Sequence, residues 1–569
     1  MAEFIDRVRE AREQIAGALR AAAAAAVAAG ELPAEASPEG DAWRGIQVEV
    51  PRDRSHGDFA TNAALVLAGH VRRTPRQVGE VLVKHLPAGA WIRRAEVAGP
   101  GFINFFLEDD WWRDGLRQIL AAGEAYGNTN VGGGRRIQVE FVSANPTGPL
   151  GVVNARAAAL GDALANVLAA AGYRVQREFY INDAGTQILK LAQSLEARIR
   201  QQLGQEAEIP EGGYPGEYVV EMARDFLATE GAGVLDLPEQ ERHDRLARYA
   251  VETLVAQMRT QLSRFRVEFD EWYPETRVRA EGYPERVLER LRARDMIYER
   301  DGAIWLRSTA VGDVKDRVMV RRNGEYTYTL VDIAYHLTKY ERGFERVIDI
   351  WGQDHHGHVV PMQAAFKALG LPDDWFEVLL TQMVHLVRGG RAVRMSKRKG
   401  ELVTMAEFLD EVDVDAARYF FLMRSPDTHL DFDLDLANLQ SSENPVYYVQ
   451  YAHARTCGIL RQAAAEYGLR PDPEGADLSF LGDPAERELA RRLLDMPGEL
   501  AAAAEAREPH RLTYYLKDVA TLFHQFYTRC RVLGEPEPVC RARLVLVDAT
   551  RLVLRRALGL LGVTAPERM

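Results

Sequence analysis

The chain has 569 residues, which is too long for a single hydrophobic core, so we expect two to four domains. Hydrophobic residues make up 47% and charged residues 27%, as in globular proteins in water, and no apolar stretch is long enough to span a membrane. The formal net charge of −12 argues weakly against a nucleic-acid partner but does not exclude one, because phosphate binding depends on local basic patches.

The N-terminal part is predicted to be a small mixed domain. Residues 1–30 have the pattern of one helix, and residues 45–110 mix short strands and helices. Within that stretch, Ala98–Leu107 begins with a Gly-Pro-Gly turn and continues as a strand. Gly132–Gly134 then marks a linker to the next domain.

A strand–helix–strand unit follows the linker. The apolar strand Ile137–Val142 leads through turn residues to a long apolar helix, Val153–Ala171, and then to a second strand, Val175–Ile181. This spacing is typical of a βαβ unit and predicts a parallel sheet. The free N–H groups at the start of the helix suit a phosphate, although an ordinary connecting loop would give the same pattern.

The remaining chain alternates between helices and strands and then becomes helical. Residues 188–265 are charged and helical and resemble an insertion. Strand-like segments return at Ala303–Leu306, Arg346–Ile350 and Val378–Val387. From about Leu434 onward, helical periodicity dominates and predicts a helical bundle.

A Met-Ser-Lys sequence, residues 395–397, is the second candidate nucleotide element. Gly389 and Gly390 precede it and permit a mobile loop, and Lys397 can bring a compact positive charge to a triphosphate. Met-Ser-Lys alone is common. It follows the Pro-x-Gly-Pro loop at 146–149 by about 250 residues, however, and the pair resembles class I aminoacyl-tRNA synthetases, whose two signatures close on ATP from opposite sides.

The block Trp351–His358 contains three histidines and Asp354. We expect no metal site here, because two of the histidines are adjacent and point apart, and the His-x-x-x-His spacing is missing. Asp354 at a strand end, with His355 and His358 at a helix start, better suits the ribose and phosphates of a nucleotide. The three cysteines also lack a metal-binding spacing and fit a reducing cytoplasm.

Tyr328 and Asp332 are four residues apart and share a face if a helix begins here. A carboxylate beside an aromatic ring suits a guanidinium group, because the carboxylate can form a bidentate pair while the ring provides a stacking wall. Glu275 is a second acidic candidate. Ordinary surface carboxylates would produce the same sequence.

Taken together, these segments resemble arginyl-tRNA synthetases over nearly the whole chain. The similarity extends to seven further blocks: His56–Leu65, Ala98–Asn104, Tyr180–Gln187, Asp332–His336, Asn444–Arg455, Phe523–Tyr527 and Ala565–Met569. The resemblance implies an α/β multidomain fold. A small α+β N-terminal domain (1–110) would contact the tRNA elbow, a Rossmann-like parallel-sheet catalytic domain (111–430) would carry a helical insertion at about 188–270, and an all-α C-terminal bundle (431–569) would bind the anticodon.

The resemblance also implies an activity and a set of site residues. The family activates L-arginine with ATP and transfers it to the 3′ end of tRNA(Arg), generally with tRNA needed for the first step, and Mg2+ accompanies the ATP. We therefore expect a cytoplasmic, monomeric arginine–tRNA ligase whose partners are tRNA(Arg), L-arginine and ATP. Arginine would be bound by Glu140 and Asn145 at its amino and carboxyl ends, and by Tyr328, Asp332 and Glu275 at its guanidinium, with Gln353 nearby. ATP would be bound by Pro149, Gly151, Asn154, Asp354, His355, His358, Met395, Ser396 and Lys397, of which Asn154, His355 and Lys397 would be catalytic.

The chain departs from the family at one point. The family carries His-x-Gly-His directly after Pro-Leu, and these positions here are Gly151, Val152, Val153 and Asn154, which we call the signature tetrad. In the family the two histidines stabilise the phosphoryl transition state, whereas here only Asn154 keeps a side-chain donor, and Val153 could obstruct adenine. Loss of one such donor typically costs about 10²–10³ in rate, so we expect arginine activation to be slowed on the order of 10³-fold or more.

Three explanations of the departure stay open: a working synthetase with relocated phosphate contacts, an inactive paralogue that still binds tRNA or arginine, and a deliberately altered sequence. The leading hypothesis is an arginine–tRNA ligase, and the alternative is the catalytically weak or inactive paralogue. A different class I specificity is a third possibility, which the guanidinium-binding pattern of Tyr328, Asp332 and Glu275 disfavours.

Overall fold

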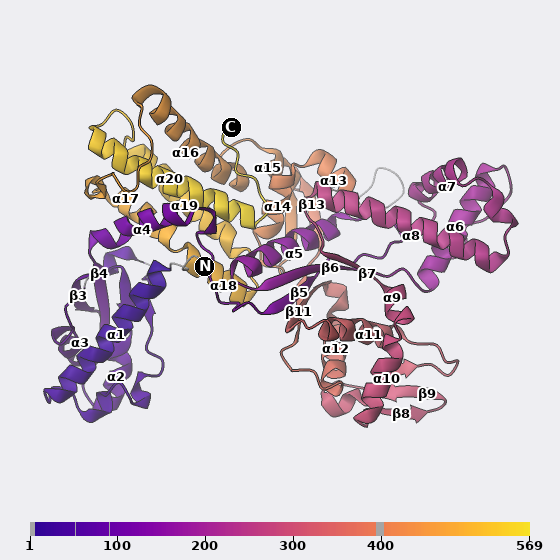
Figure 1. Cartoon of the computed structure of the whole chain (residues 1–569), viewed down its shortest axis with the longest axis horizontal. Helices are drawn as coiled ribbons and strands as arrows, with labels where there is room; N and C mark the ends of the chain where they lie inside the picture. The colour runs from indigo at the N-terminus through magenta and orange to yellow at the C-terminus, as the bar shows by residue number, and fades with distance from the viewer. Residues whose placement is uncertain (1–5, 52, 90, 394–402) are drawn as a thin grey trace.

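The computed structural model describes residues 6–51, 53–89, 91–393 and 403–569. The N-terminal domain, a central parallel sheet with two insertions, and a helical bundle are arranged side by side in an extended molecule (Figure 1). The predicted α/β multidomain fold is confirmed. None of the helices in the described ranges is long and apolar enough to cross a membrane.

The N-terminal domain packs three helices against a four-stranded antiparallel sheet of order β1-β2-β4-β3. Its elements are α1 Arg7–Ala28, β1 Val48–Glu49, β2 Phe59–Thr61, α2 Ala63–Val71, α3 Pro75–Lys84, β3 Ile92–Ala98 and β4 Phe102–Leu107. Helix α1 forms because apolar residues such as Ile15 and Leu19 recur at helical spacing and are fully buried. The mixed character expected for residues 45–110 is therefore observed.

The central sheet contains five parallel strands in the order β12-β11-β5-β6-β7. In chain order, its strands are β5 Arg136–Glu140, β6 Arg174–Ile181, β7 Glu271–Pro274, β11 Arg346–Gly352 and β12 Phe376–Thr381. Helix α5 Val152–Ala170 joins β5 to β6. The predicted βαβ unit is present as β5-α5-β6. The chain runs outward from β5 to β7 and then returns to β11 on the other side of β5. Ligands of such sheets bind at the carboxyl ends of the strands at this switch point.

Helix α5 lies directly against the end of β5. At Gly161 an added Cβ would come 2.1 Å from the ring of Phe141, so only glycine permits this close approach. Phe141 is itself fully buried. The glycine therefore fixes the distance between the helix and the loop that follows β5.

Two insertions extend the central domain. The first is helical and has a core of its own, as expected for residues 188–265. It consists of α6 Thr186–Gln202, α7 Glu217–Thr229 and α8 Glu239–Arg264. The second carries an antiparallel three-stranded sheet between helices, with α9 Glu275–Ala280, α10 Tyr283–Ala293, β8 Ile297–Arg300, β9 Ala303–Leu306, β10 Arg317–Val320, α11 Tyr328–Glu341 and, after β11, α12 His356–Ala368.

One predicted strand-like segment is in fact two strands. Val378–Val387 divides into β12, in the central sheet, and β13 Val384–Arg388, which pairs with β14 Arg391–Ala392 and β15 Leu430–Asp433 in a separate sheet. The break occurs because the N–H of Gln382 leaves the central sheet and donates to Pro426 O at 3.0 Å. Continuous hydrophobicity concealed this change of partner.

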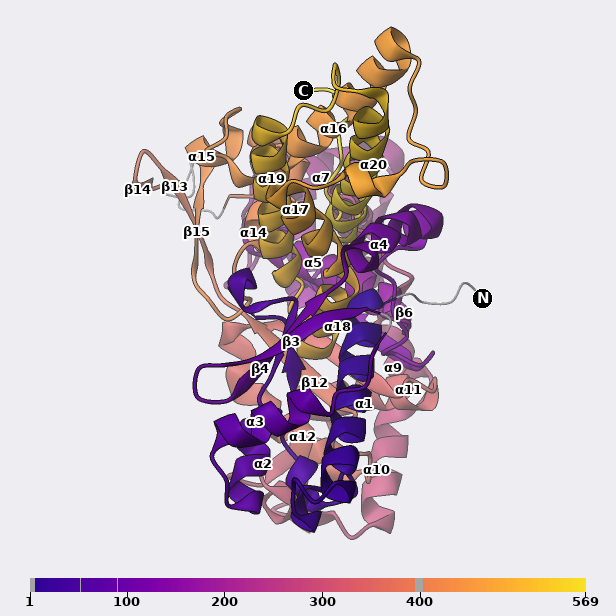
Figure 2. The same ribbon diagram turned by 90° about the vertical axis from the view of Figure 1, so that its left-hand side faces the viewer.

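The C-terminal part is helical from Leu434 onward, as predicted. Its helices are α15 Leu434–Asn438, α16 Pro445–Tyr467, α17 Pro484–Leu494, α18 Met496–Ala506, α19 Arg511–Arg529 and α20 Glu537–Leu560. Two helices precede it directly, α13 Met405–Glu411 and α14 Val414–Leu422, and helix α4 Asp109–Ala122 comes from much earlier in the chain. Helix α4 lies along the bundle beside α17 and α20 (Figures 1 and 2). It links the N-terminal domain to the bundle.

Candidate active site

The loop that follows β5 is sharply turned at the carboxyl edge of the central sheet. Val142 and Ser143 have φ angles of 69° and 36°, a region that residues other than glycine rarely adopt. Ser143 Oγ donates to Glu140 Oε1 at 2.8 Å and accepts from the N–H of Tyr180 at 3.1 Å. These bonds hold the turned backbone beside β6.

The signature tetrad forms the first turn of α5. Gly151 is the residue before the helix, and its N–H donates to Asn154 Oδ1 at 2.9 Å. Val152 is buried, whereas Val153 is 37% exposed on the open face of the turn. The N–H groups of Gly151, Val152 and Asn154 already donate within the protein, so Asn154 Nδ2 and the N–H of Val153 are the donors that an anion could use here.

The segment after the Met-Ser-Lys sequence lies against this turn. The N–H of Val152 donates to Val403 O at 3.3 Å, and the N–H of Met405 donates to Leu150 O at 2.7 Å. Met395, Ser396 and Lys397 themselves lie outside the described residues. The neighbouring backbone on their C-terminal side is nevertheless bonded to the nucleotide loop.

Three carboxylates surround the side chain of Tyr180, which β6 carries. The Tyr180 hydroxyl donates to Glu275 Oε2 at 3.3 Å. Burial, followed by the charges of Glu275, Asp332 and Glu140, raises the pKa of Tyr180 well above its usual value. We call Glu140, Glu275 and Asp332 the acidic cluster. Glu275 pairs with Arg279 and Glu140 with Lys339, whereas Asp332 is exposed, so a cationic ligand would meet Asp332 first.

The predicted helix start at Tyr328 is confirmed, and it puts Tyr328 and Asp332 on one face of α11. Tyr328 is 60% exposed and the Asp332 side chain 44% exposed, so both can reach a ligand. Glu275, at the start of α9, is buried and accepts 2.9 and 2.6 Å bonds from Nε and Nη2 of Arg279. A guanidinium group of the chain itself therefore already pairs with this carboxylate.

The remaining predicted residues lie at the ends of β5 and β11. Gln353, Asp354, His355 and His358 are all exposed between the end of β11 and the first turn of α12. The His355 and His358 rings are 5.9 Å apart between centroids. At the end of β5, Pro149 is exposed, and Asn145 Nδ2 donates to Gln187 Oε1 at 3.1 Å. Because β5 and β11 are neighbours, these two groups flank the same edge of the sheet.

Comparison with known sequences shows which protein family has this architecture. Residues 9–107 match the arginyl tRNA synthetase N-terminal domain, residues 115–427 the catalytic domain of class I (R) tRNA synthetases, and residues 449–569 the DALR anticodon-binding domain. The chain is 52% identical over 564 residues to the arginine–tRNA ligase of Moorella thermoacetica, covering 99% of this chain and 100% of that protein. The chain belongs to the arginyl-tRNA synthetase family.

Other members of the family support the same assignment. The arginine–tRNA ligase of Symbiobacterium thermophilum is 51% identical, covering 99% of this chain and 100% of that protein. The Thermus thermophilus arginyl-tRNA synthetase structure covers 98% of this chain and 100% of its own, with a TM-score of 0.73 and 24% identity. At that identity the similarity shows the fold. Class I tRNA synthetases use ATP, so the family also accounts for a nucleotide loop.

Sequence reasoning missed several residues of this arginyl-tRNA synthetase site. Tyr180 lies at the centre of the acidic cluster, and Lys339 and Asp349 are buried next to Glu140. Tyr180 belongs to the Tyr180–Gln187 block, which contributed to the family resemblance but was not assigned a role in the site. Its position at the end of a βαβ strand could have indicated one. Lys339 and Asp349 gave no local signal, because their partners lie on other elements.

Proposed function

We propose that this arginyl-tRNA synthetase is an arginine–tRNA ligase. It activates L-arginine with ATP to arginyl adenylate and transfers the arginyl group to the 3′ end of tRNA(Arg). The observation that carries the proposal is the acidic cluster around Tyr180, beside an exposed aromatic ring and one loop away from the N-terminus of α5. The names of the curated relatives agree with it.

The guanidinium group is assigned to Asp332, Glu275 and Tyr328, with Gln353 nearby. Asp332 supplies an accessible carboxylate and Tyr328 an exposed ring on the same helical face, which supports stacking and ion pairing. Glu275 reaches a ligand by sharing its carboxylate with Arg279 or exchanging that partner. Glu140 and Asn145 are assigned to the amino and carboxyl ends of the amino acid.

ATP is assigned to the carboxyl edge formed by β5 and β11. The proposed contacts are Pro149, Gly151, Asn154, Asp354, His355 and His358, together with Met395, Ser396 and Lys397, which lie outside the described residues. The first turn of α5 suits the phosphates because its N–H groups carry partial positive charge. Mg2+ would enter with ATP and shield phosphate charge.

The proposed chemistry has two steps. A carboxylate oxygen of arginine attacks the α-phosphorus of ATP, and the bond to the bridging oxygen breaks, so pyrophosphate leaves. A ribose hydroxyl at the tRNA 3′ end then attacks the arginyl carbonyl carbon, loses its proton, and displaces AMP. The role of Asn154, His355 and Lys397 would be to donate to phosphate oxygens as charge builds there.

Two surfaces support tRNA binding. The N-terminal domain (1–110) has a hollow of about 510 Å³ whose lining includes His56, Asn62, Phe102 and Asn104. Phe102 is 42% exposed and can stack on a base. This hollow is assigned to the tRNA elbow.

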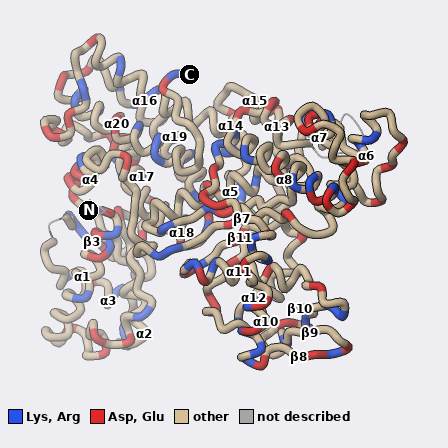
Figure 3. Tube along the Cα trace, turned by 45° about the vertical axis from the view of Figure 1, so that its right-hand side comes forward, with Lys and Arg blue, Asp and Glu red and all other residues tan. Residues whose placement is uncertain are grey.

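The helical bundle (431–569) is assigned to the anticodon. It offers parallel rings at Tyr447 and Tyr451, 6.3 Å apart, with the Arg455 guanidinium over Tyr451. Basic and acidic residues are interspersed along the trace (Figure 3). Binding therefore depends on such local groups and not on net charge.

The decisive experiment is arginylation of tRNA(Arg) by the purified full chain, with pyrophosphate exchange measured with and without tRNA. Arginyl-tRNA should form, and exchange should require arginine. No product at high enzyme concentration, with tight and salt-dependent tRNA binding, would instead support a catalytically inactive paralogue. The proposal includes a monomeric enzyme acting in the cytoplasm, and the first part is tested by measuring its mass in solution.

A further inference from the structure

A buried chain of charges connects two members of the acidic cluster, Asp332 on α11 and Glu140 on β5. The chain passes through His336, Asp349 and Lys339. These three residues are at most 1% exposed, whereas Glu140 is 7% exposed. Charged groups are rarely buried without a reason, because removal from water is costly.

His336 forms the first link. Its Nδ1 is 2.8 Å from Asp332 O and 3.2 Å from Asp332 Oδ1, and its Nε2 is 2.8 Å from Asp349 Oδ2. Since both ring nitrogens face oxygen acceptors, the protonated imidazolium satisfies both contacts at once. His336 thereby ties the side chain of Asp332 to the middle of the sheet.

Lys339 forms the second link, one helical turn further along α11. Its Nζ donates to Asp349 Oδ1 at 3.0 Å and to Glu140 Oε2. The Tyr335 hydroxyl lies 2.8 Å from the same Glu140 oxygen and 2.6 Å from Glu178 Oε1, and its single hydrogen serves one of them at a time. Glu140 is thus held by groups of α11 and by Ser143 of its own loop.

Three buried carboxylates of this network face three cations, and the exposed Asp332 is one further negative charge. Glu178 accepts two bonds from the Arg342 guanidinium, at 2.5 and 2.9 Å. Glu140, Asp349 and Glu178 therefore face the cations His336, Lys339 and Arg342. Such pairing offsets the burial of each group, and removal of one member leaves an uncompensated charge.

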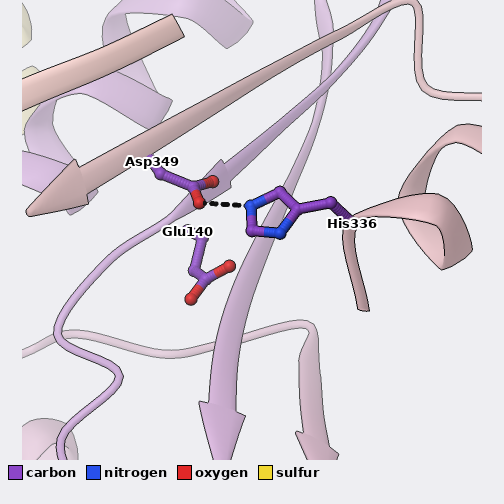
Figure 4. A group of neighbouring side chains, drawn as sticks. All are labelled: Glu140, His336 and Asp349. Atoms are coloured by element: carbon purple, nitrogen blue, oxygen red, sulfur yellow. Dashed lines mark hydrogen bonds and ion pairs between the residues drawn. The ribbon is translucent and has the colours of Figure 1, made fainter. Parts of the chain in front are cut away.

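A metal ion is an alternative occupant of this region. Glu140, His336 and Asp349 each offer a ligand atom, and these atoms lie within 4.8 Å of one another (Figure 4). Lys339 Nζ, however, bonds to both carboxylates of the group, so an ammonium already provides the positive charge. An ion would have to displace it, and we therefore assign no metal here.

We propose that His336 and Lys339 are positioning residues for arginine recognition, with His336 fixing the carboxylate that binds the guanidinium and Lys339 fixing the carboxylate that binds the α-amino group. This inference rests on the proposed function, because it takes Asp332 and Glu140 as ligand contacts. Because the two residues share Asp349 and one helix, they set the distance between the two carboxylates. That distance determines how long an amino acid must be to reach both carboxylates.

The surroundings of His336 favour its charged form. Burial and the ammonium of Lys339 lower its pKa, but Asp349 and Asp332 outweigh them and raise the pKa to about 9. Around the imidazole are Asp332, Lys339 and Tyr335 of its own helix, Asp349 of β11 and Glu140 of β5. The rings of Phe366 on α12 and Phe376 on β12 complete the contact.

The test compares two ligands of the full-length enzyme, L-arginine and 5-guanidinopentanoate, which lacks only the α-amino group. Lys339→Met should weaken the binding of L-arginine about 10- to 100-fold and change the affinity for 5-guanidinopentanoate by no more than about twofold. His336→Gln should weaken both ligands to a similar extent. KM for ATP should stay unchanged in both, and Lys367→Met, an exposed lysine on α12, should change nothing.

Equal weakening of both ligands by Lys339→Met, or a matching rise in KM for ATP, would overturn the proposal in favour of general structural damage. If Lys339→Met does not fold, Tyr335→Phe provides the same comparison, because it removes a Glu140 contact without leaving a buried charge unpaired. A wild-type enzyme that binds no arginine would refute the proposed function itself. Normal wild-type activity with unaffected variants would refute only the inference.

Loss of arginine binding on chelation, restored by Zn2+ or Mg2+ alone, would establish the metal alternative and overturn the role of Lys339.

Discussion

The side-chain oxygen of Asn154 accepts a hydrogen bond from the backbone N–H of Gly151, at 2.9 Å. Asn154 therefore closes the first turn of α5, and its Nδ2 is the one side-chain donor that the signature tetrad retains. Position 151 has no side-chain donor, although there is enough space there for one. The nearest atoms to an added Cβ there are 3.8 Å away, and the φ of Gly151 is −93°, which any residue can adopt.

Rebuilding the family signature with Gly151→His, Val153→Gly and Asn154→His together should therefore increase activity. We expect kcat for arginine activation to rise by about 10³-fold, because preorganised donors return to the phosphoryl transition state. KM for arginine should not change, since the acidic cluster is untouched. Pyrophosphate exchange measures both quantities.

Val153→Gly alone separates the two effects. It should lower KM for ATP if the exposed Val153 side chain obstructs adenine, without restoring kcat. A folded triple variant with no gain in kcat would show that phosphate contacts have moved elsewhere in the site.

Asp332→Asn should weaken arginine binding, because an amide cannot form a charged pair with a guanidinium. A hydrogen bond between charged groups contributes about 1.5–3 kcal/mol, so KM for arginine should rise about 10- to 100-fold. Glu341→Gln, near the other end of the same helix, is the control and should leave KM unchanged. A normal KM in Asp332→Asn would remove this residue from the guanidinium site.

Much of the fold, and one face of the site, follow from local sequence patterns. The βαβ unit was predictable because continuous apolar strands flank a long apolar helix, as in parallel sheets covered on both faces. Tyr328 and Asp332 were predictable as a pair because helical spacing alone puts them on one face. These inferences use information within a few residues.

The rest depends on contacts between distant residues. The contact between Lys339 and Glu140 joins residues 199 positions apart, and that between Tyr180 and Glu275 joins residues 95 apart. No periodicity reveals such partners. The pairing of Arg279 with Glu275, by contrast, is local and follows from the same helical spacing as that of Tyr328 and Asp332.

Phe102→Ala should weaken tRNA binding without affecting the amino acid. Stacking of a base on an aromatic ring contributes about 1–3 kcal/mol, so KM for tRNA should rise about tenfold. KM for arginine and ATP should stay the same. Val314→Ala, at an exposed position far along the chain, is the matched control. An unchanged KM for tRNA would mean that the hollow beside Phe102 does not contact it.

The ion pair between Asp58 and Arg491 should set the relative position of the two tRNA surfaces. It joins the N-terminal domain to α17 at 2.5 Å, and Asp58 is 2% exposed. Arg491→Met leaves this carboxylate buried and unpaired, which typically costs about 3–5 kcal/mol. We expect a lower Tm and a higher KM for tRNA. Adding Asp58→Asn should recover part of both, and a double variant no better than Arg491→Met would contradict the role of the pair.

The buried imidazolium of His336 should make stability depend on alkaline pH. Its pKa of about 9 in the folded protein lies above the ordinary value of 6.5, so folding favours the protonated form. The stabilisation is complete below pH 6.5 and is lost as pH rises through 9. A shift of this size corresponds to on the order of 3 kcal/mol. Denaturant unfolding of wild type and His336→Gln should therefore show a difference in unfolding free energy that is constant below pH 6.5, falls between pH 6.5 and 9, and levels off above pH 9. A difference that instead rises as pH increases toward 6.5 would show that His336 is buried as the neutral imidazole.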